Sequence, residues 1–319
     1  MHMNDALISP AVAGTIGIIS AATLAVALKK VKHSSSNGII PLMGVMGAFI
    51  FVAQMINFAI PGTGSSGHII GAIILAAILG PWAAITVLST VLIIQCLLFA
   101  DGGLMALGCN IFNMGILPCL IAYPLLFKPF IRYPVSFAKL SAISVLTCVC
   151  AMELGALALV AETTISGITA LPMGKFLLFM LPIHFVIGIC EGMATATIIY
   201  YIQEHQPSLL LESSLNGYKS TMKSSPIKSA IISALAIIIL GATAGYLASS
   251  LPDGLEWSIE NVTNGSIIGS SIPSTITTIQ DTTAIMPDYE YPLSGIIGSV
   301  SVVVIIFIIS LLLKRKTKP

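Results

Sequence analysis

The sequence predicts an all-α, polytopic membrane protein, and its composition is the main reason. Hydrophobic residues make up 56% of the 319 residues and charged residues only 8%, whereas about 25% of the residues in a soluble domain are charged. The 14 basic and 13 acidic residues are so sparse that long windows contain none. Several windows reach the length of about 20 residues that a helix needs to cross a bilayer. A soluble globular protein is therefore excluded, and lipid is an expected partner.

Nine apolar segments are expected to form helices, and one of them is short. The short segment is Ile69–Leu79, and Gly80-Pro81-Trp82 should interrupt the helix after it, because Pro removes a backbone donor and clashes with the preceding turn. The other eight are long enough to span the membrane: Val12–Leu28, Pro41–Ile60, Ala83–Ala100, Ile111–Phe127, Ser141–Ala161, Phe176–Ile202, Ile227–Leu251 and Leu293–Leu313.

Basic residues predict the orientation of the chain, because Lys and Arg are retained on the cytoplasmic side of a membrane. With the N-terminus outside, 13 of the 14 basic residues lie in cytoplasmic segments, and only Lys175 lies outside. We therefore expect an outer N-terminus and a cytoplasmic C-terminus. The first residues lack the positive n-region and the small-residue cleavage site of a signal peptide, so Met1 is expected to remain in the mature protein.

Two modules are expected from a break in composition. Residues 1–202 should form a core of seven segments, followed by a polar cytoplasmic linker over residues 203–227. Residues 228–319 should form a helical hairpin whose two spans are joined by a long outer loop, residues 252–292, rich in Ser, Thr, Asn and Gly. This division separates an apolar core from a smaller C-terminal part.

His2 is the most informative residue, because of its place beside a free chain start. The α-amine of Met1, the backbone amide nitrogen of His2 and the His2 ring nitrogen can close two fused chelate rings. Three nitrogens in one plane suit square-planar coordination, which favours Ni(II) or Cu(II) and disfavours Mg(II) or Ca(II). A fourth nitrogen would complete the square.

His68 is the candidate for that fourth nitrogen. It follows the loop Pro61-Gly-Thr-Gly-Ser-Ser-Gly67 and lies on the same predicted side of the membrane as His2. The glycines of the loop allow backbone angles that could aim the ring inward. Spacing alone leaves a plainer interpretation open, in which His2 is an exposed side chain and His68 a helix-end residue.

Four stretches of the sequence occur together in one known family. They are Met1-His2-Met3, the run from Gly64 through His68 to Trp82, the run from Leu98 through Asp101 and Asn110 to Gly115, and the run from His184 through Glu191 to Gly192. These stretches resemble the NikM/CbiM type of nickel- or cobalt-binding substrate (S) component of energy-coupling-factor (ECF) transporters.

The C-terminal part resembles the NikN part that is fused to some of these proteins. The resemblance rests on Pro252-Asp-Gly-Leu-Glu256-Trp257 and on Met286-Pro-Asp-Tyr-Glu-Tyr-Pro292, which two spans flank. Together the two matches cover nearly the whole chain. One departure is Asn4-Asp5-Ala6, which stands where the family has a Pro-Asp-Gly-like stretch and so affects the expected path of the N-terminal loop.

The resemblance implies a subunit that captures a metal ion at the outer face of a bacterial or archaeal cell membrane. The implied metal site consists of Met1, His2 and His68, and the implied partners are ABC-type ATPase subunits and a transmembrane coupling subunit. Ni(II) is the expected substrate, because a square of four nitrogens suits it and because the C-terminal part is NikN-like; cobalt uptake by the same mechanism is the alternative.

Catalysis and nucleotide binding are not expected of this chain. The sequence contains no G-x-x-x-x-G-K-[ST] motif, which ABC-type ATPases use to hold phosphates. The net charge of +1 gives no reason to expect a nucleic-acid partner, which requires clustered Lys and Arg. We therefore expect a transport subunit that is not an enzyme and that depends on ATP hydrolysis in its partners.

The positions of four further polar residues suggest roles for them. Asp101 and Asn110 are expected on the outer face, where they could hold a ring N–H or order the loops, or simply cap helices. Glu153 and Glu191 fall inside predicted spans, where an ionisable group is costly and suggests function. Glu191 follows His184 by two helical turns, so these two residues are expected to form a packing or partner-docking pair.

The sequence leaves two rival functions open. Gly64-Ser-Ser66-Gly67 matches a G-x-S-G nucleophile motif, and His184 could act as the base of a rhomboid-type intramembrane serine protease. That hypothesis leaves the other motifs unexplained. A passive metal channel would need several carboxylates along a pore, whereas the predicted spans contain only Glu153 and Glu191.

Overall fold

The computed structural model describes residues 1–34, 39–210, 239–244, 246, 248–264, 274–289 and 293–313. Within them, six helical segments are long and apolar enough to cross a membrane. These are α1 (Pro10–Ser34), α4 (Pro81–Phe99), the segment from α5 (Leu107–Ile111) through η2 (Phe112–Ile116) and η3 (Pro118–Phe127), α6 (Phe137–Ser166), α7 (Met173–His205) and α12 (Ser294–Leu313). The chain is therefore a mostly helical, multi-pass membrane protein.

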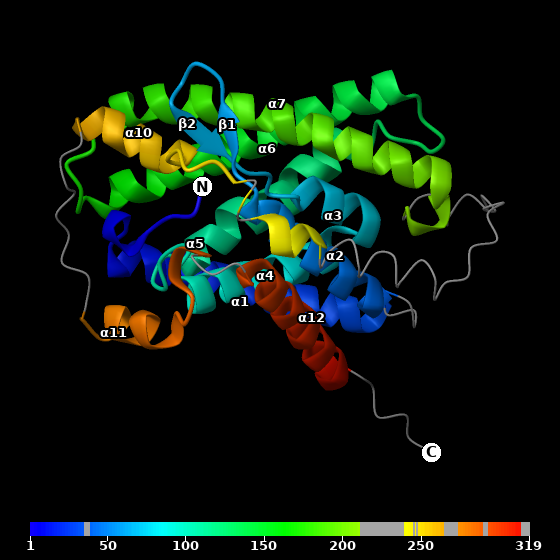
Figure 1. The fold of residues 1–319 in the computed structure, drawn as a ribbon, viewed down its shortest axis with the longest axis horizontal. Helices are drawn as coiled ribbons and strands as arrows, with labels where there is room; N and C mark the ends of the chain where they lie inside the picture. Colours follow the sequence, from blue (N-terminus) through cyan, green and yellow to red (C-terminus); the bar gives the residue numbers. More distant parts are fainter. Residues whose placement is uncertain are drawn as a thin grey trace.

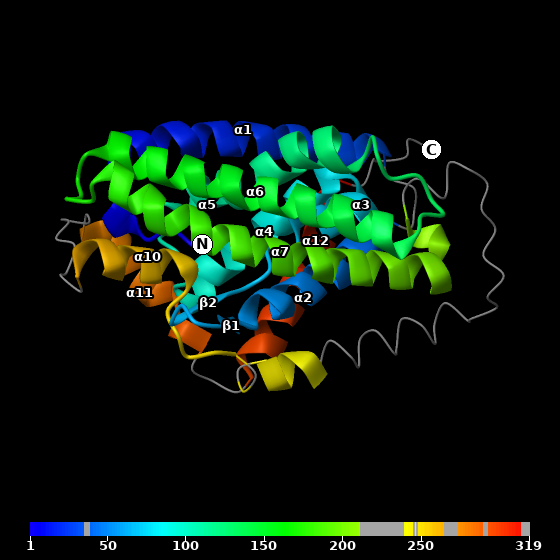
Figure 2. The ribbon, with the colours of Figure 1, turned by 90° about the horizontal axis from the view of Figure 1, so that it is seen from above.

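Helix α4 lies at the centre of the bundle, and the other spans surround it (Figures 1 and 2). Its apolar window is 78% buried inside the protein, against 17% for α1 and 28% for α12. The outer helices expose large apolar side chains such as Ile18, Leu178 and Leu312. Lipid tails are as apolar as these side chains, so a membrane helix gains nothing by turning them inward.

Helix α2 (Ile39–Met55) is shorter than predicted, and the all-α prediction is wrong at its end. The predicted span reached Ile60, but the chain leaves the helix at Met55 and forms strand β1 (Phe58–Ile60). This strand pairs antiparallel with β2 (Ser65–Gly67). Gly62 and Gly64 adopt φ of +79° and +74° in the connecting turn, which glycine accepts without steric cost.

The expected break after the short apolar segment is confirmed. Helix α3 spans Ala72–Leu79, and α4 begins at Pro81 after Gly80 with φ of +81°. Proline suits the first position of a helix because that residue needs no N–H partner. Every residue of α3 is buried, so this helix fills the core.

The next span has wider turns than an ordinary α-helix. From Phe112 to Phe127 the backbone is largely π-helical in η2 and η3. Pro118 and Pro124 lie in η3 and remove two backbone donors, which disrupts the regular hydrogen-bond ladder. Despite the two prolines, the span remains helical to Phe127. It begins at Leu107, four residues before the predicted Ile111.

The C-terminal part packs on the core. Helix α12 contacts α2 and α4, and its Gly295 lies against Gly241 of the helical residues 239–244, so that the two backbones touch. The predicted span Ile227–Leu251 lies mostly outside the described residues, which here are helical only at 239–244 and 246. The predicted outer loop is partly helical, with α10 (Gly254–Thr263), α11 (Ser274–Thr283) and η5 (Pro287–Tyr289).

Helices α6 and α7 pack through glycines on α7. A methyl group on Gly188 would stand 2.7 Å from Cα of Val149, and one on Gly192 would overlap the backbone of Val145. Small residues at such positions let membrane helices approach closely, and dispersion forces then hold them together.

Substitution Gly192→Ala is expected to lower the midpoint of thermal unfolding in detergent, by the equivalent of about 1–3 kcal/mol, because the added methyl group forces α6 and α7 apart. Gly174→Ala is the matched control, since nothing lies within 4 Å of a methyl group at that position of α7. An equal midpoint for the two variants would contradict this account of the helix pair.

Candidate metal site

Met1, Met3 and Asp5 are buried, and hydrogen bonds between side chains and backbone hold this start of the chain. Met3 is fully buried; its N–H donates to Asn110 Oδ1 at 2.7 Å, and its carbonyl accepts from Asn110 Nδ2 at 3.1 Å. Asp5 Oδ1 accepts from the backbone N–H of Ala106 at 2.8 Å. The Asn4-Asp5 stretch that departs from the family pattern thus fixes the N-terminal segment to the loop before α5.

His68 lies between strand β2 and helix α3, and a carboxylate fixes the loop that carries it. Both oxygens of Glu191, on α7, accept backbone N–H groups, from Ile70 and Gly71, at 2.9 Å each. The carbonyl of Ile70 accepts from Gln54 Nε2 at 2.8 Å. Side chains of α2 and α7 therefore hold the loop from both sides and aim the His68 ring at the chain start.

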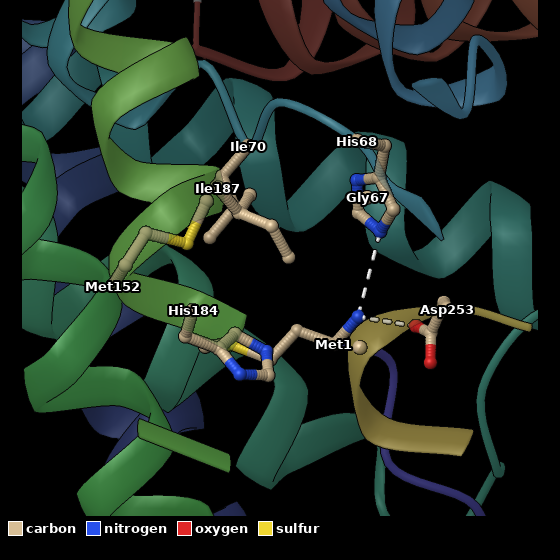
Figure 3. Close-up of a pocket in the computed structure, with 9 residues that line it drawn as sticks. Met1, Gly67, His68, Ile70, Met152, His184, Ile187 and Asp253 are labelled. Atoms are coloured by element: carbon tan, nitrogen blue, oxygen red, sulfur yellow. Dashed lines mark hydrogen bonds and ion pairs between the residues drawn. The ribbon is translucent and has the colours of Figure 1, made fainter. Parts of the chain in front are cut away.

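The α-amine of Met1 lies between His68 and Asp253 (Figure 3). Its nitrogen is 3.5 Å from His68 Nε2 and forms an ion pair with Asp253 Oδ2 at 2.6 Å. Burial, and next the charge of this amine, lower the pKa of His68 to about 3. The imidazole is therefore neutral at neutral pH and has a lone pair available to bind a cation.

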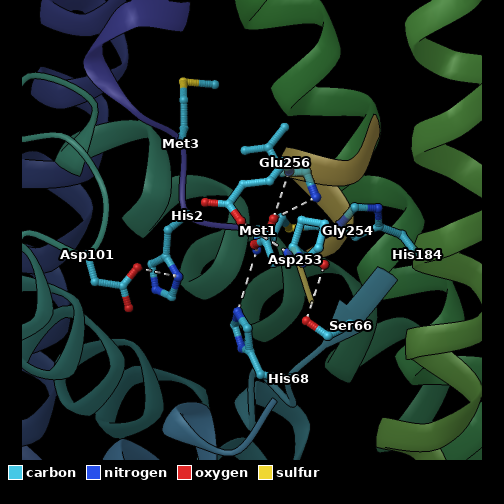
Figure 4. Close-up of polar contacts among 12 residues, drawn as sticks. Met1, His2, Met3, Ser66, His68, Asp101, His184, Asp253, Gly254 and Glu256 are labelled. Atoms are coloured by element: carbon cyan, nitrogen blue, oxygen red, sulfur yellow. Dashed lines mark hydrogen bonds and ion pairs between the residues drawn. The ribbon is translucent and has the colours of Figure 1, made fainter. Parts of the chain in front are cut away.

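The ring of His2 stacks on that of His68, with centroids 5.2 Å apart and planes at 22°. His2 Nδ1 faces Asp101 Oδ1 at 3.2 Å (Figure 4), and Nε2 faces Gln95 Oε1 at 3.2 Å. Burial lowers the pKa of His2, although the Asp101 carboxylate opposes this shift. Both ring nitrogens thus face acceptor oxygens, so the ring must carry a proton on each nitrogen that donates.

A chain of two amides links His2 to the loop of His68. Gln95, which accepts from His2, donates through Nε2 to Gln54 Oε1 at 2.9 Å, and Gln54 donates in turn to Ile70. Partners of this kind behind a metal-binding histidine fix its tautomer and its orientation. The contact with Gln95 occupies Nε2, and Nδ1, the nitrogen that can close a chelate ring with the backbone, lies on the side of Asp101.

These donors fit a small cation that prefers nitrogen. Neighbouring nitrogens around a square-planar ion, at bonds of about 2.0 Å, lie roughly 2.8 Å apart, and the amine and His68 Nε2 stand at 3.5 Å. A small approach would bring these two into place, whereas the His2 ring must turn Nδ1 away from Asp101. Within the described residues no three His, Cys, Asp or Glu side chains are grouped for a metal; the candidate site combines main-chain nitrogens with two rings.

The structure gives His184 and Glu191 separate surroundings. Glu191 binds the His68 loop, while His184 Nδ1 lies 2.7 Å from the Met180 carbonyl, and its Nε2 is buried without a hydrogen-bond partner. His184 lines a small cavity together with Met1, His68 and Asp253 (Figure 3), with room for about one water molecule. The expected pairing of His184 with Glu191 is replaced by contacts to the metal-site loops.

The geometry does not favour a serine protease. Ser66 is fully buried, and its hydroxyl donates to the carbonyl of Leu251 at 2.8 Å. A nucleophile needs a base within hydrogen-bond reach, and His184 is engaged with Met180 instead. Ser66 here joins strand β2 to the C-terminal part of the chain.

The sequence analysis did not predict three residues of the site: Gln54, Gln95 and Asp253. Both glutamines lie in otherwise apolar predicted spans, and such polar residues in a membrane helix point to a function or to a buried network. Asp253 was named only as part of a stretch that carries the family resemblance. Its place in the Pro252-Asp-Gly-Leu-Glu256 motif was the available signal, but no sequence rule connects that motif with Met1.

Comparison with known proteins decides the family. Residues 2–209 match the family model CbiM, described as the cobalt uptake substrate-specific transmembrane region, and residues 228–315 match the PDGLE domain. The chain belongs to the CbiM family. The match confirms the resemblance on which the sequence interpretation relied.

Relatives of this CbiM-family chain include fused proteins with both parts. A protein of Archaeoglobus fulgidus named "Putative fused nickel transport protein NikMN" is 28% identical over 323 residues, which cover 96% of this chain and 97% of the relative. The "Fused nickel transport protein NikMN" of Rhodobacter capsulatus is 38% identical over 125 residues, 38% of this chain and 35% of that protein. A crystal structure of a transition metal transporter superposes with a TM-score of 0.56 at 31% identity, covering 64% of this chain and 93% of the other.

Substitution Glu191→Gln is expected to loosen the His68 loop of this CbiM-family protein. An amide offers one acceptor where the carboxylate offers two, so one of the two N–H groups loses its partner, at a cost of about 1–3 kcal/mol. The midpoint of thermal unfolding in detergent should therefore fall. Glu153→Gln is the control, because Glu153 Oε1 has no hydrogen-bond partner; equal losses in both variants would contradict the assignment.

Proposed function

We propose that this chain captures Ni(II) at the outer face of the membrane, as the substrate-binding subunit of an ATP-driven ECF transporter. The observation that carries the proposal is the convergence of the Met1 amine and His68 on one point, 3.5 Å apart, with His2 beside them. The backbone amide and Nδ1 of His2 supply the remaining nitrogens of a square. Membership of the CbiM family and the names of the fused relatives support transport of nickel or cobalt.

Nickel is proposed over cobalt because of the donor set. Four nitrogens in a plane suit the square-planar geometry that Ni(II) adopts readily. Cu(II) would bind such a square still more tightly on ligand affinity alone, so selection in a cell also depends on which metal is available. Cobalt uptake by the same site is the alternative, and the metal content of the purified protein distinguishes the two.

Partner subunits are proposed to supply the energy. The sequence has no Walker-type phosphate loop, so a pair of ABC-type ATPases and a transmembrane coupling subunit would drive transport. In this mechanism the outer loops close over the ion, and a tilt of the whole subunit turns the site towards the cytoplasm. The N-terminus and the loops of His68, Asp101 and Asp253 meet at one place. This arrangement supports a mechanism in which these loops close over one ion.

A free N-terminus is expected to be essential. Protein purified with an unmodified Met1 should contain nickel by elemental analysis, while protein with one residue added before Met1 should contain none, because the added residue moves the amine out of the chelate. The same extension at the C-terminus is the control and should leave the nickel content unchanged. Undiminished nickel in the N-terminally extended protein would refute the site, and cobalt in its place would refute the selectivity.

Loss of the fourth nitrogen should weaken binding without abolishing it. In His68→Ala the amine, the amide and the His2 ring still chelate, so calorimetry should still detect Ni(II) binding. The affinity should fall by more than about 10–100-fold, the usual effect of losing a residue that only supports a ligand, because His68 is itself a ligand. His205→Ala is the matched control, since His205 contacts the Tyr201 carbonyl at the far end of α7. A wild-type affinity in His68→Ala would remove His68 from the site.

A further inference from the structure

We propose that Asp253 is a metal-positioning residue, whose carboxylate holds the Met1 amine in place and supplies a negative charge beside the bound cation. The C-terminal part of the chain would thereby complete a site whose ligands all come from the first 68 residues. This inference rests on the proposed function, and it assigns a task to the PDGLE domain at the level of one side chain.

The two oxygens of Asp253 have separate roles. Oδ2 contacts the Met1 amine at 2.6 Å, and Oδ1 accepts the backbone N–H groups of Leu255 and Glu256 at 2.8 Å each, which caps helix α10. The cap fixes the carboxylate, because both bonds are to backbone groups at a helix N-terminus. The oxygen that faces the amine is therefore held by the helix (Figure 4).

Backbone contacts also fix Asp253 relative to His68. The segment before Asp253 runs beside strand β2, where the N–H of Ser66 donates to the Pro252 carbonyl at 2.8 Å and the Ser66 hydroxyl donates to the Leu251 carbonyl. Ser66 precedes His68 by two residues on the same strand and loop. The amine, its carboxylate partner and the His68 ring are thus parts of one rigid arrangement.

The contact between the Met1 amine and Asp253 can persist as a hydrogen bond when a metal ion binds. Binding of the cation releases one proton from the Met1 ammonium and one from the His2 amide to water, and the bound amine keeps two N–H bonds, one of which can still reach Asp253 Oδ2. Ni(II) with one deprotonated amide retains a single positive charge, which would be buried. A buried charge without a partner is strongly destabilising, and the Asp253 carboxylate supplies the compensating charge.

Metal occupancy and docking of the C-terminal part are coupled if Asp253 acts in this way. Thermodynamic linkage is reciprocal, so a carboxylate that tightens metal binding is itself held more firmly when the metal is present. Segments far apart in the sequence would then close over the ion as one unit. The fused architecture keeps Asp253 within reach of Met1 at all times.

The test compares Asp253→Asn with Glu256→Gln in the full chain with a free N-terminus. Asparagine is as good a helix cap as aspartate, so Asp253→Asn removes the charge and leaves α10 capped. Glu256→Gln removes the same charge three residues away, where Glu256 contacts the backbone N–H of Asp253. Ni(II) affinity is measured by calorimetry, and acetylation of the Met1 amine is followed by mass spectrometry in the metal-free proteins.

Asp253→Asn is expected to weaken Ni(II) binding roughly 10–100-fold, the usual effect of losing an outer-shell partner, and to speed acetylation of the amine. Asp253→Glu should restore part of the affinity, and Glu256→Gln should behave as wild type. The inference is overturned by wild-type or tighter binding in Asp253→Asn, or by equal losses in both charge variants. Failure of the wild-type protein to bind Ni(II) would contradict the proposed function instead, and the acetylation rates would still test the contact with Asp253.

Discussion

The ion pair between the Met1 amine and Asp253 is the interaction on which the rest of the candidate metal site depends. A charged chain terminus is normally solvated at the surface, whereas here it is buried in a strongly apolar protein. A buried charge requires a partner and fixed geometry. The packing of the helices brings His68, Asn110 and Asp253 together at the start of the chain, where they contact Met1 and Met3.

Glycines and hydrogen-bonded polar side chains build the scaffold behind that contact. Glu191 and Gln54 hold the His68 loop through its backbone, and Asn110 holds the backbone of Met3 on both sides. Each polar side chain within the apolar bundle is costly unless it is satisfied. Their bonds to the loop backbone both satisfy these side chains and keep the loops in place.

The two parts of the chain meet at the proposed site. The proposed ligands His2 and His68 belong to the region that matches the CbiM model, which Met1 directly precedes, and Asp253 belongs to the region that matches the PDGLE domain. A chain that carries both parts keeps the second part at high effective concentration near the first. The fold thus offers a physical reason for fusing the two parts.

Composition and local pattern in the sequence were sufficient to predict a multi-pass helical membrane protein, the helix break at Gly80, the family and the candidate ligands Met1, His2 and His68. These follow from hydrophobicity, proline chemistry and short motifs, which are local properties. Tertiary structure alone decided that α2 gives way to a strand at Phe58 and that Glu191 serves the His68 loop. It alone also brought Asp253 to Met1, because a contact between residues 252 positions apart arises from the packing of helices and leaves no trace in local periodicity.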